Sequence, residues 1–147
     1  MIEARCHCGA VRLLVAAPPQ TLTDCNCSIC VKLGALWAYY TADEVEVRAA
    51  EDALQDYQRA DAARAHPELK PVLAFVHCKT CGCVTHWRSL DATSQRMGIN
   101  ARMMPETVRA AAQVRRLDGA NSWRYLDEPP DSPRPGGAGD DSLRTTS

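Results

Sequence analysis

The hexapeptide CKTCGC, residues 78 to 83, places three cysteines in one short segment, and the fold must be built around it. An apolar run, Val72 to His77, enters the segment, and Val84 to Arg88 leaves it. Two apolar, β-branched or aromatic runs on either side of a short glycine-containing loop are typical of a β-hairpin. The sequence therefore predicts a hairpin whose turn presents thiol groups.

A second predicted hairpin, near the N-terminus, carries another pair of cysteines. Cys6 and Cys8 form its turn, and apolar side chains alternate from residue 11 to residue 15. Structural zinc sites are usually built from two such turns, each presenting two thiolates. A glycine beside each turn permits the positive φ angles that let backbone amides point at sulfur. Pairing the two turns predicts one structural zinc site with four ligands: Cys6, Cys8, Cys78 and Cys81.

The composition indicates a single globular domain that does not bind nucleic acid. The chain has 147 residues, of which 46% are hydrophobic and 24% charged, with a net charge of −1. Nucleic-acid-binding domains are usually strongly basic, whereas the pI here is near 6.4. The N-terminal MIEARCHCGA lacks the basic head and apolar run of a signal peptide, and no apolar stretch approaches the roughly 18 to 20 residues that span a membrane. We expect a soluble, cytoplasmic protein.

The eight cysteines require an explanation in such a protein. An even number permits a disulfide framework, and redox-active thiols are a further alternative. A reducing cytosol disfavours disulfides, and cysteines clustered this densely in loops are typical of metal ligands. Thiolates in a tetrahedral arrangement suit zinc, so zinc is the predicted metal.

The remaining segments predict short strands with few helices, hence a mainly β fold. Strands are predicted over residues 21–24, 35–41, 45–47, 97–104 and 114–117. Residues 51–66 are compatible with a helix or with an edge strand followed by a loop, and Pro105-Glu106 predicts a short helix through Ala112. We expect one zinc-binding domain over residues 1–128 and a disordered tail over residues 129–147, where almost nothing can be buried.

The stretch CNCSIC, residues 25 to 30, supplies the third cysteine group. Ser28 is placed to begin a short helical turn that continues to Leu33, which sets Cys30 near the positive end of a helix dipole. Three protein ligands with one open position are typical of a reactive zinc, and four ligands are typical of an inert one. Whether the site is reactive or inert depends on Cys83, which would close it as the fourth ligand.

Electrostatics favours thiol chemistry over hydrolysis at an open site of this kind. A zinc dication with three thiolates carries a net charge of about −1, so it acidifies a bound water weakly. Such a zinc can instead hold an incoming thiol as thiolate, the nucleophilic form of sulfur. Two other hypotheses stay open at this stage. One is a closed two-zinc module that engages a protein partner, and the other is a sensor in which Cys27 or Cys83 leaves zinc and is oxidised.

Three motifs in this order, CHCGAVR, CNCSIC and CKTCGC, resemble the glutathione-dependent formaldehyde-activating enzyme family, which is related to centromere protein V. The resemblance covers residues 3 to 104 and extends toward Leu126. It implies a β-tent fold of stacked antiparallel sheets with two zinc ions. It also implies that the four cysteines named above bind the structural zinc, and that a second, catalytic zinc has three ligands: Cys25, Cys27 and Cys30.

The activity implied by the resemblance is the condensation of glutathione with formaldehyde to S-(hydroxymethyl)glutathione, a carbon–sulfur lyase reaction in reverse. The expected partners are a small thiol such as glutathione and a small aldehyde. The predicted catalytic residues are Cys27, as a ligand of the reactive zinc, and His86, as the acid that protonates the alkoxide product, because imidazole titrates near neutrality. After the third cysteine group, alternation places Trp37 and Tyr39 on one strand face and Tyr40 on the other, either as core residues or as a wall of the substrate cleft.

Overall fold

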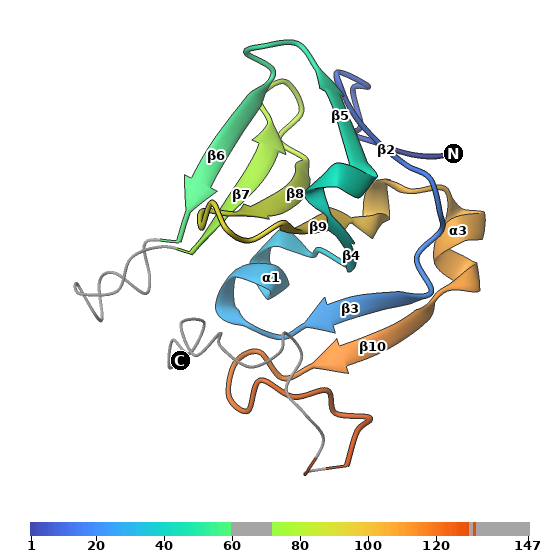
Figure 1. The fold of residues 1–147 in the computed structure, drawn as a ribbon, viewed down its shortest axis with the longest axis vertical. Helices are drawn as coiled ribbons and strands as arrows, with labels where there is room; N and C mark the ends of the chain where they lie inside the picture. Colours follow the sequence, from blue (N-terminus) through green and yellow to red (C-terminus); the bar gives the residue numbers. More distant parts are fainter. Residues whose placement is uncertain (60–71, 130, 132–147) are drawn as a thin grey trace.

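A computed structural model of the chain describes residues 1–59, 72–129 and 131, and within them the strands form two sheets (Figure 1). The smaller sheet has three strands in the order β1-β2-β5, all antiparallel. Their bounds are Ile2–Arg5 for β1, Val11–Val15 for β2 and Val45–Ala49 for β5.

The larger sheet has seven strands in the order β10-β3-β4-β9-β8-β7-β6. Its strands are β3 (Thr21–Cys25), β4 (Trp37–Thr41), β6 (Leu54–Gln58), β7 (Leu73–Cys78), β8 (Val84–Ser89), β9 (Arg96–Asn100) and β10 (Gln113–Leu117). Neighbours in this sheet are antiparallel apart from β10 and β3, which run parallel. The predicted mainly β fold is confirmed.

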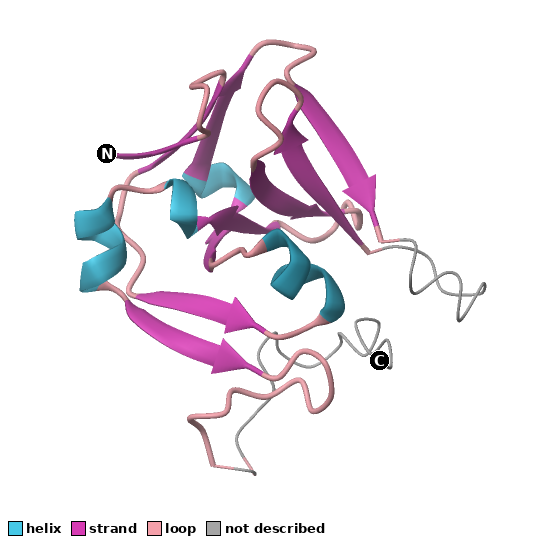
Figure 2. Cartoon of the chain, turned by 180° about the vertical axis from the view of Figure 1, so that it is seen from behind, coloured by secondary structure: helices cyan, strands magenta, loops and turns pink. Residues whose placement is uncertain are grey.

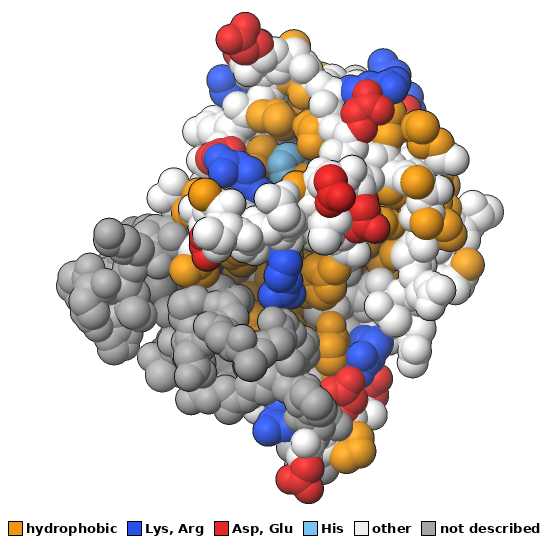
Figure 3. All heavy atoms as spheres, in the orientation of Figure 1, with side chains coloured by type: hydrophobic (Ala, Val, Ile, Leu, Met, Phe, Trp, Pro, Cys, Tyr) orange, Lys and Arg blue, Asp and Glu red, His pale blue; other side chains and the backbone are white. Residues whose placement is uncertain are grey.

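Short helices connect the strands (Figure 2). They are α1 (Ser28–Leu33), α3 (Glu106–Ala111) and the 3-10 helices η1 (Ala42–Glu44) and η2 (Ala101–Met103). Among the described residues, none of these helices has the length and apolar character that a membrane crossing requires. On the face shown in Figure 3, basic and acidic side chains are interspersed, in keeping with the small net charge.

Both predicted hairpins with cysteine turns are present. β1 pairs with β2 around the turn at residues 6–9, and β7 pairs with β8 around the turn at residues 78–83. The predicted strand over residues 97–104 is too long, because β9 ends at Asn100. The Asn100 side chain accepts a hydrogen bond from the backbone N–H of Arg102 at 3.2 Å, which caps η2 and ends the strand.

The segment 51–66 contributes an edge strand rather than a helix. β6 occupies residues 54–58 at one end of the seven-stranded sheet, where it pairs with β7. Residues 60–66 of that segment lie outside the described residues. So does the predicted disordered tail, residues 129–147, apart from Pro129 and Asp131.

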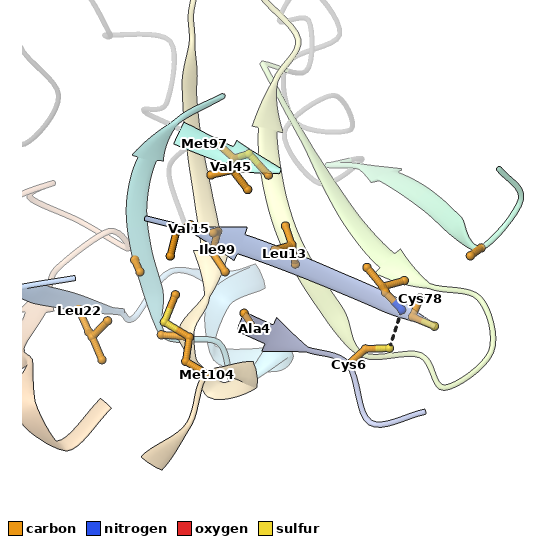
Figure 4. Packing of buried hydrophobic residues seen from close by; sticks show 14 residues of the cluster. Ala4, Cys6, Leu13, Val15, Leu22, Val45, Cys78, Met97, Ile99 and Met104 are labelled. Atoms are coloured by element: carbon orange, nitrogen blue, oxygen red, sulfur yellow. Dashed lines mark hydrogen bonds between the residues drawn. The ribbon is translucent and has the colours of Figure 1, made fainter. Parts of the chain in front are cut away.

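The main core lies between the two sheets (Figure 4). Leu13 and Val15 of β2 point toward Ile99 and Met97 of β9, and all four side chains are buried. Apolar side chains from both sheets therefore meet in one layer, and burying them is the main apolar contribution to folding. Cys6 lies at one end of this layer, so the first cysteine group is anchored to the core.

A second buried cluster lies on the other face of the seven-stranded sheet. It contains Trp37, Phe75 and Trp87, and it also contains the cysteines of the third group. Side chains of neighbouring residues in a strand point to opposite faces, so Trp37 belongs to this cluster while Ala38 belongs to the core between the sheets. The ring of Tyr39 packs on Trp87, so the predicted division of the aromatic residues is confirmed.

Candidate metal centres

The first candidate metal centre is the group of four cysteines that the two hairpin turns bring together: Cys6, Cys8, Cys78 and Cys81. Their Sγ atoms all lie within 4.8 Å of one another. The Sγ atom of Cys8 lies 3.6 Å from that of Cys6 and 3.6 Å from that of Cys78. Tetrahedral zinc with Zn–S bonds of about 2.3 Å requires sulfur–sulfur separations of about 3.8 Å. The donor set and its spacing therefore fit a structural zinc.

Backbone amides surround this group and stabilise thiolate. Gly9 and Gly82 have positive φ angles of 81° and 73°, as the turn chemistry predicts. The N–H of Val11 donates to Cys6 Sγ at 3.3 Å. Hydrogen bonds from the amides of Cys8 and Cys83 lower the pKa of Cys81 to about 5. The turns thus favour the ionised form of Cys81, the form in which a cysteine binds a metal ion.

Cys83 lies beside this first group and not beside the third. Its carbonyl accepts a hydrogen bond from the N–H of Cys78 at 2.9 Å, which closes the turn and holds both residues on it. The amide of His7 points at the Cys83 sulfur, and the charges of Cys81 and Cys6 act on it. The structure therefore does not bring Cys83 to the site that the sequence suggested it could close.

The second candidate metal centre, the three-cysteine group, consists of Cys25, Cys27 and Cys30. Cys25 ends β3, Cys27 is the residue before α1, and Cys30 lies in the first turn of that helix. All three are buried, and their Sγ atoms lie within 4.8 Å of one another. The helix predicted over residues 28–33 is present and ends at Gly34 in the left-handed conformation. In the described part of the chain, no fourth cysteine, histidine or carboxylate joins this group.

Hydrogen-bond donors also converge on the three-cysteine group. Hydrogen bonds from the thiols of Cys25 and Cys30, and then from the amides of Cys30 and Ile29, hold the pKa of Cys27 far below its usual range. The indole Nε1–H of Trp37 donates to Cys30 Sγ at 3.2 Å. The donors around Cys27 favour negative charge on its sulfur, and the group as a whole supplies three of the four ligands that tetrahedral zinc takes.

Aromatic rings and hydroxyl groups form the surroundings of the three-cysteine group. The rings of Trp37 and Phe75 lie 6.0 Å apart, centroid to centroid. Thr23 Oγ1 and the Tyr125 hydroxyl are 2.7 Å apart. Burial raises the pKa of Tyr39, against the effect of a hydrogen bond from Thr23, and the charge of Tyr125 and of the cysteines raises it further. A cluster of hydroxyl groups therefore adjoins the thiolates. Nothing in the sequence pattern indicates that Thr23 and Tyr125 belong to it, because they lie 102 positions apart.

His86 lies on the opposite face of the seven-stranded sheet from the three-cysteine group. It pairs with Val76 and with Ile99, a residue of the core between the sheets, whereas the next residue, Trp87, belongs to the cluster that contains the cysteines. The imidazole is 4% exposed, and burial lowers its pKa to about 4. Its Nδ1 lies 2.9 Å from Thr85 Oγ1. The structure therefore does not bring His86 to the predicted catalytic zinc.

A β-bulge explains this placement. Val84 pairs with His77 and His86 pairs with Val76, which leaves Thr85 as an extra residue in β8. The Thr85 hydroxyl donates to the Val76 carbonyl at 3.1 Å, which stabilises the irregular pairing. Strict alternation over these residues would place Val84 and His86 on one face, but the bulge sends them to different ones.

Comparisons with known proteins agree with this architecture. Residues 1–116 match the family model described as glutathione-dependent formaldehyde-activating enzyme. Proteins of curated function give no match. Among solved structures, a crystal structure of a Rhodobacter sphaeroides protein, a structural genomics target, is similar with a TM-score of 0.55 and 22% sequence identity. The similarity covers 76% of this chain and 98% of that one, and it supports the fold. All eight cysteines lie within the matched residues, and the chain belongs to the glutathione-dependent formaldehyde-activating enzyme family.

Proposed function

We propose that this protein is a zinc-dependent carbon–sulfur lyase that joins a small thiol, glutathione or a close analogue, to formaldehyde or a related small aldehyde. The observation that carries the proposal is the unequal size of the two cysteine groups. One group offers four thiolates and the other offers three, so only the second leaves a ligand position for a substrate. Family membership supports glutathione and formaldehyde as the substrates.

The three-cysteine group holds and orients the reactive centre. Zinc bound by Cys25, Cys27 and Cys30 would supply the positive charge that keeps an incoming thiol deprotonated at neutral pH. Cys27, between the other two ligands in sequence, has the sulfur most favoured as thiolate by its neighbours. The Trp37 indole fixes Cys30 through its N–H bond, in the way that outer hydrogen bonds orient metal ligands.

Bond formation then requires one nucleophile and one proton. The thiolate sulfur of the substrate attacks the aldehyde carbon, a carbon–sulfur bond forms, and the electron pair of the carbonyl π bond moves to oxygen. That oxygen takes up one proton, which offsets the proton that the thiol lost on becoming thiolate, so the net reaction is the addition of the thiol to the aldehyde and the product is a hemithioacetal. We propose the Tyr39 hydroxyl as the proton donor, because the charges of Cys25 and Cys30 act on it and because its pKa, raised chiefly by burial, lies well above neutral pH, so that it carries a proton.

The surroundings also favour this reaction over hydrolysis. Trp37, Phe75 and Trp87 are buried next to the cysteines, so their rings limit the access of water. A cytoplasmic location accords with the proposal, because glutathione keeps thiols reduced there and all eight cysteines are unpaired in the structure. The alternative, an inert module with two four-cysteine sites, requires Cys83 as the fourth ligand of the second site. Cys83 lies instead beside the first group.

The test is the exchange of glutathione with formaldehyde, followed by two-dimensional exchange NMR at equilibrium. We expect the wild-type, zinc-loaded protein to accelerate the exchange above the spontaneous rate in proportion to its concentration. Cys27→Ser should return the rate to the spontaneous value. Several small thiols and aldehydes should be compared, and the absence of any protein-dependent acceleration across all of them would contradict the proposal.

A further inference from the structure

The segment that follows β10 folds back over the three-cysteine group. Because β10 runs parallel to β3, both strands end at the same sheet edge, and Leu117 lies opposite Cys25. The chain then turns and returns, so that Tyr125 pairs with Leu117, and the N–H of Trp123 donates to the Asp118 carbonyl at 2.8 Å. We name Leu117–Tyr125 the cover segment. It begins where the family match, residues 1–116, ends.

Asn26 joins the cover segment to the loop between two of the three cysteines. Its side-chain Nδ2–H donates to Asp118 Oδ1 at 2.8 Å, and its Oδ1 accepts from the N–H of Ala120 at 2.9 Å. Its backbone N–H donates to the Leu117 carbonyl at 3.1 Å. One residue thus makes three hydrogen bonds to the cover segment.

The Asp118 carboxylate organises the cover segment from within. Besides Asn26, it accepts hydrogen bonds from Asn121 Nδ2 at 3.1 Å and from the backbone N–H and hydroxyl of Ser122 at 3.0 Å and 2.8 Å. Together these donors, with Asn26 the strongest, hold the pKa of Asp118 well below its usual range. Hydrogen bonds to an ionised acceptor are about twice as strong as neutral ones, so the loop depends on this charge.

Gly119 brings the cover segment into direct contact with a cysteine sulfur. A Cβ atom at this position would lie 2.5 Å from Cys25 Sγ and 3.0 Å from a ring carbon of Trp123. Its φ angle is outside the left-handed region, so the backbone conformation itself would accept alanine. Glycine is therefore required at this position because a side chain would collide with the Cys25 sulfur atom.

We propose that Asn26 and Asp118 are positioning residues of the second metal centre: they clamp Gly119 against Cys25, so that the cover segment is a fixed wall that restricts how thiols and metal chelators reach the three cysteines. The identity of the physiological thiol rests on the proposed function, but the clamp does not. The hydrogen bonds and the glycine contact are properties of this chain with or without catalysis.

The test is site-resolved alkylation of the protein as purified, using iodoacetamide and peptide mass spectrometry, with zinc release to a chromogenic chelator followed in parallel. The variants are Asp118→Ala, Asp118→Asn and Gly119→Ala. Asp24→Asn is the matched control, because it removes the same charge beside Cys25 from an exposed carboxylate that makes no hydrogen bond or ion pair within the described residues. Cysteines of the first group serve as the internal reference.

In Asp118→Ala, we expect iodoacetamide to alkylate the three-cysteine group about tenfold faster than in wild type. We expect zinc release from this group to be faster by the same factor, the lower range for the loss of a residue that hydrogen-bonds around a metal site. Asp118→Asn should have a smaller effect because it retains the size and one oxygen acceptor. In Gly119→Ala, the visible absorption of cobalt bound at this group should also change, because the added methyl group displaces Cys25. The control should match wild type.

Unchanged labelling of the three cysteines in every variant would overturn the inference, as would equally faster labelling of both cysteine groups, which indicates general loosening. The zinc count separates the two proposals. If the wild type binds one zinc and does not accelerate exchange, the proposed function fails. Faster labelling of the three-cysteine group alone would still support the clamp.

Discussion

The two cysteine groups differ in how the chain builds them. The four-cysteine group is assembled by two hairpin turns, each organised by local backbone hydrogen bonds and a glycine with positive φ, and Cys8 within it is exposed. The three-cysteine group is buried, and contacts from Trp37, Asn26 and the cover segment surround it. A site built by local turns suits a permanent structural ion. A site enclosed by distant segments can control what reaches it.

Removing a ligand of the four-cysteine group should have the largest effect. Structural zinc in small domains contributes roughly 10 to 16 kcal/mol of binding free energy, comparable with the whole stability of a domain of this size. Cys78→Ser should therefore abolish cooperative unfolding. Thermal denaturation followed by circular dichroism measures this, and a cooperative transition near the wild-type temperature would contradict the structural role.

Removing a ligand of the three-cysteine group should leave a folded protein. Cys27→Ser should lose one zinc and all exchange activity, while its melting transition stays cooperative, because the first group and the core between the sheets are intact. Zinc analysis, melting and exchange NMR on one preparation make the comparison. Complete unfolding of this variant would remove the proposed difference between the two groups.

The buried His86 should make the free energy of unfolding depend on pH, an effect of intermediate size. Its pKa falls from 6.5 in the unfolded chain to about 4 in the folded one, because of burial. Between these two pH values the unfolded state binds the extra proton, so the free energy of unfolding should decrease as the pH falls from 6.5 to 4, by on the order of 3 kcal/mol from this group.

The measurement for His86 is urea unfolding at several pH values for wild type and His86→Asn. Acid also protonates cysteines and releases zinc from both proteins, so the difference between the two proteins isolates the histidine. The variant should lose less stability over this pH range. Parallel curves would show that the imidazole is not a buried neutral group.

Tyr39 and His86 can be compared as proton donors. Tyr39→Phe should lower the exchange rate about a hundredfold at saturating thiol, the lower range for a general acid, with little change in thiol affinity. His86→Asn should stay within about threefold of wild type, because the imidazole lies on the other face of the sheet. A larger loss of exchange rate in His86→Asn than in Tyr39→Phe would indicate that His86 is the proton donor.

The parts of the molecule that follow local rules could be predicted from the sequence. The cysteine turns, the α1 helix ended by Gly34 and the placement of Trp37 and Tyr40 on opposite strand faces all depend on spacing or on glycine. The face of His86 could not be predicted, because the bulge at Thr85 interrupts alternation without a sequence signal.

Contacts between distant segments were equally inaccessible to the sequence. The bond between Asn26 and Asp118 joins residues 92 positions apart, and neither residue type has a unique partner. The position of Cys83 is intermediate. The sequence left open whether Cys83 closes the three-cysteine group, and the hydrogen bond from the N–H of Cys78 to the Cys83 carbonyl holds it beside the four-cysteine group instead.

The most direct test of the account is native mass spectrometry of the wild type beside Cys83→Ser, counting bound zinc. Cys83 belongs to neither ligand set, although it lies next to the four-cysteine group. We therefore predict two zinc ions in both proteins. One zinc in the variant and two in the wild type would show that Cys83 is a ligand, and would contradict a second centre with three thiolates.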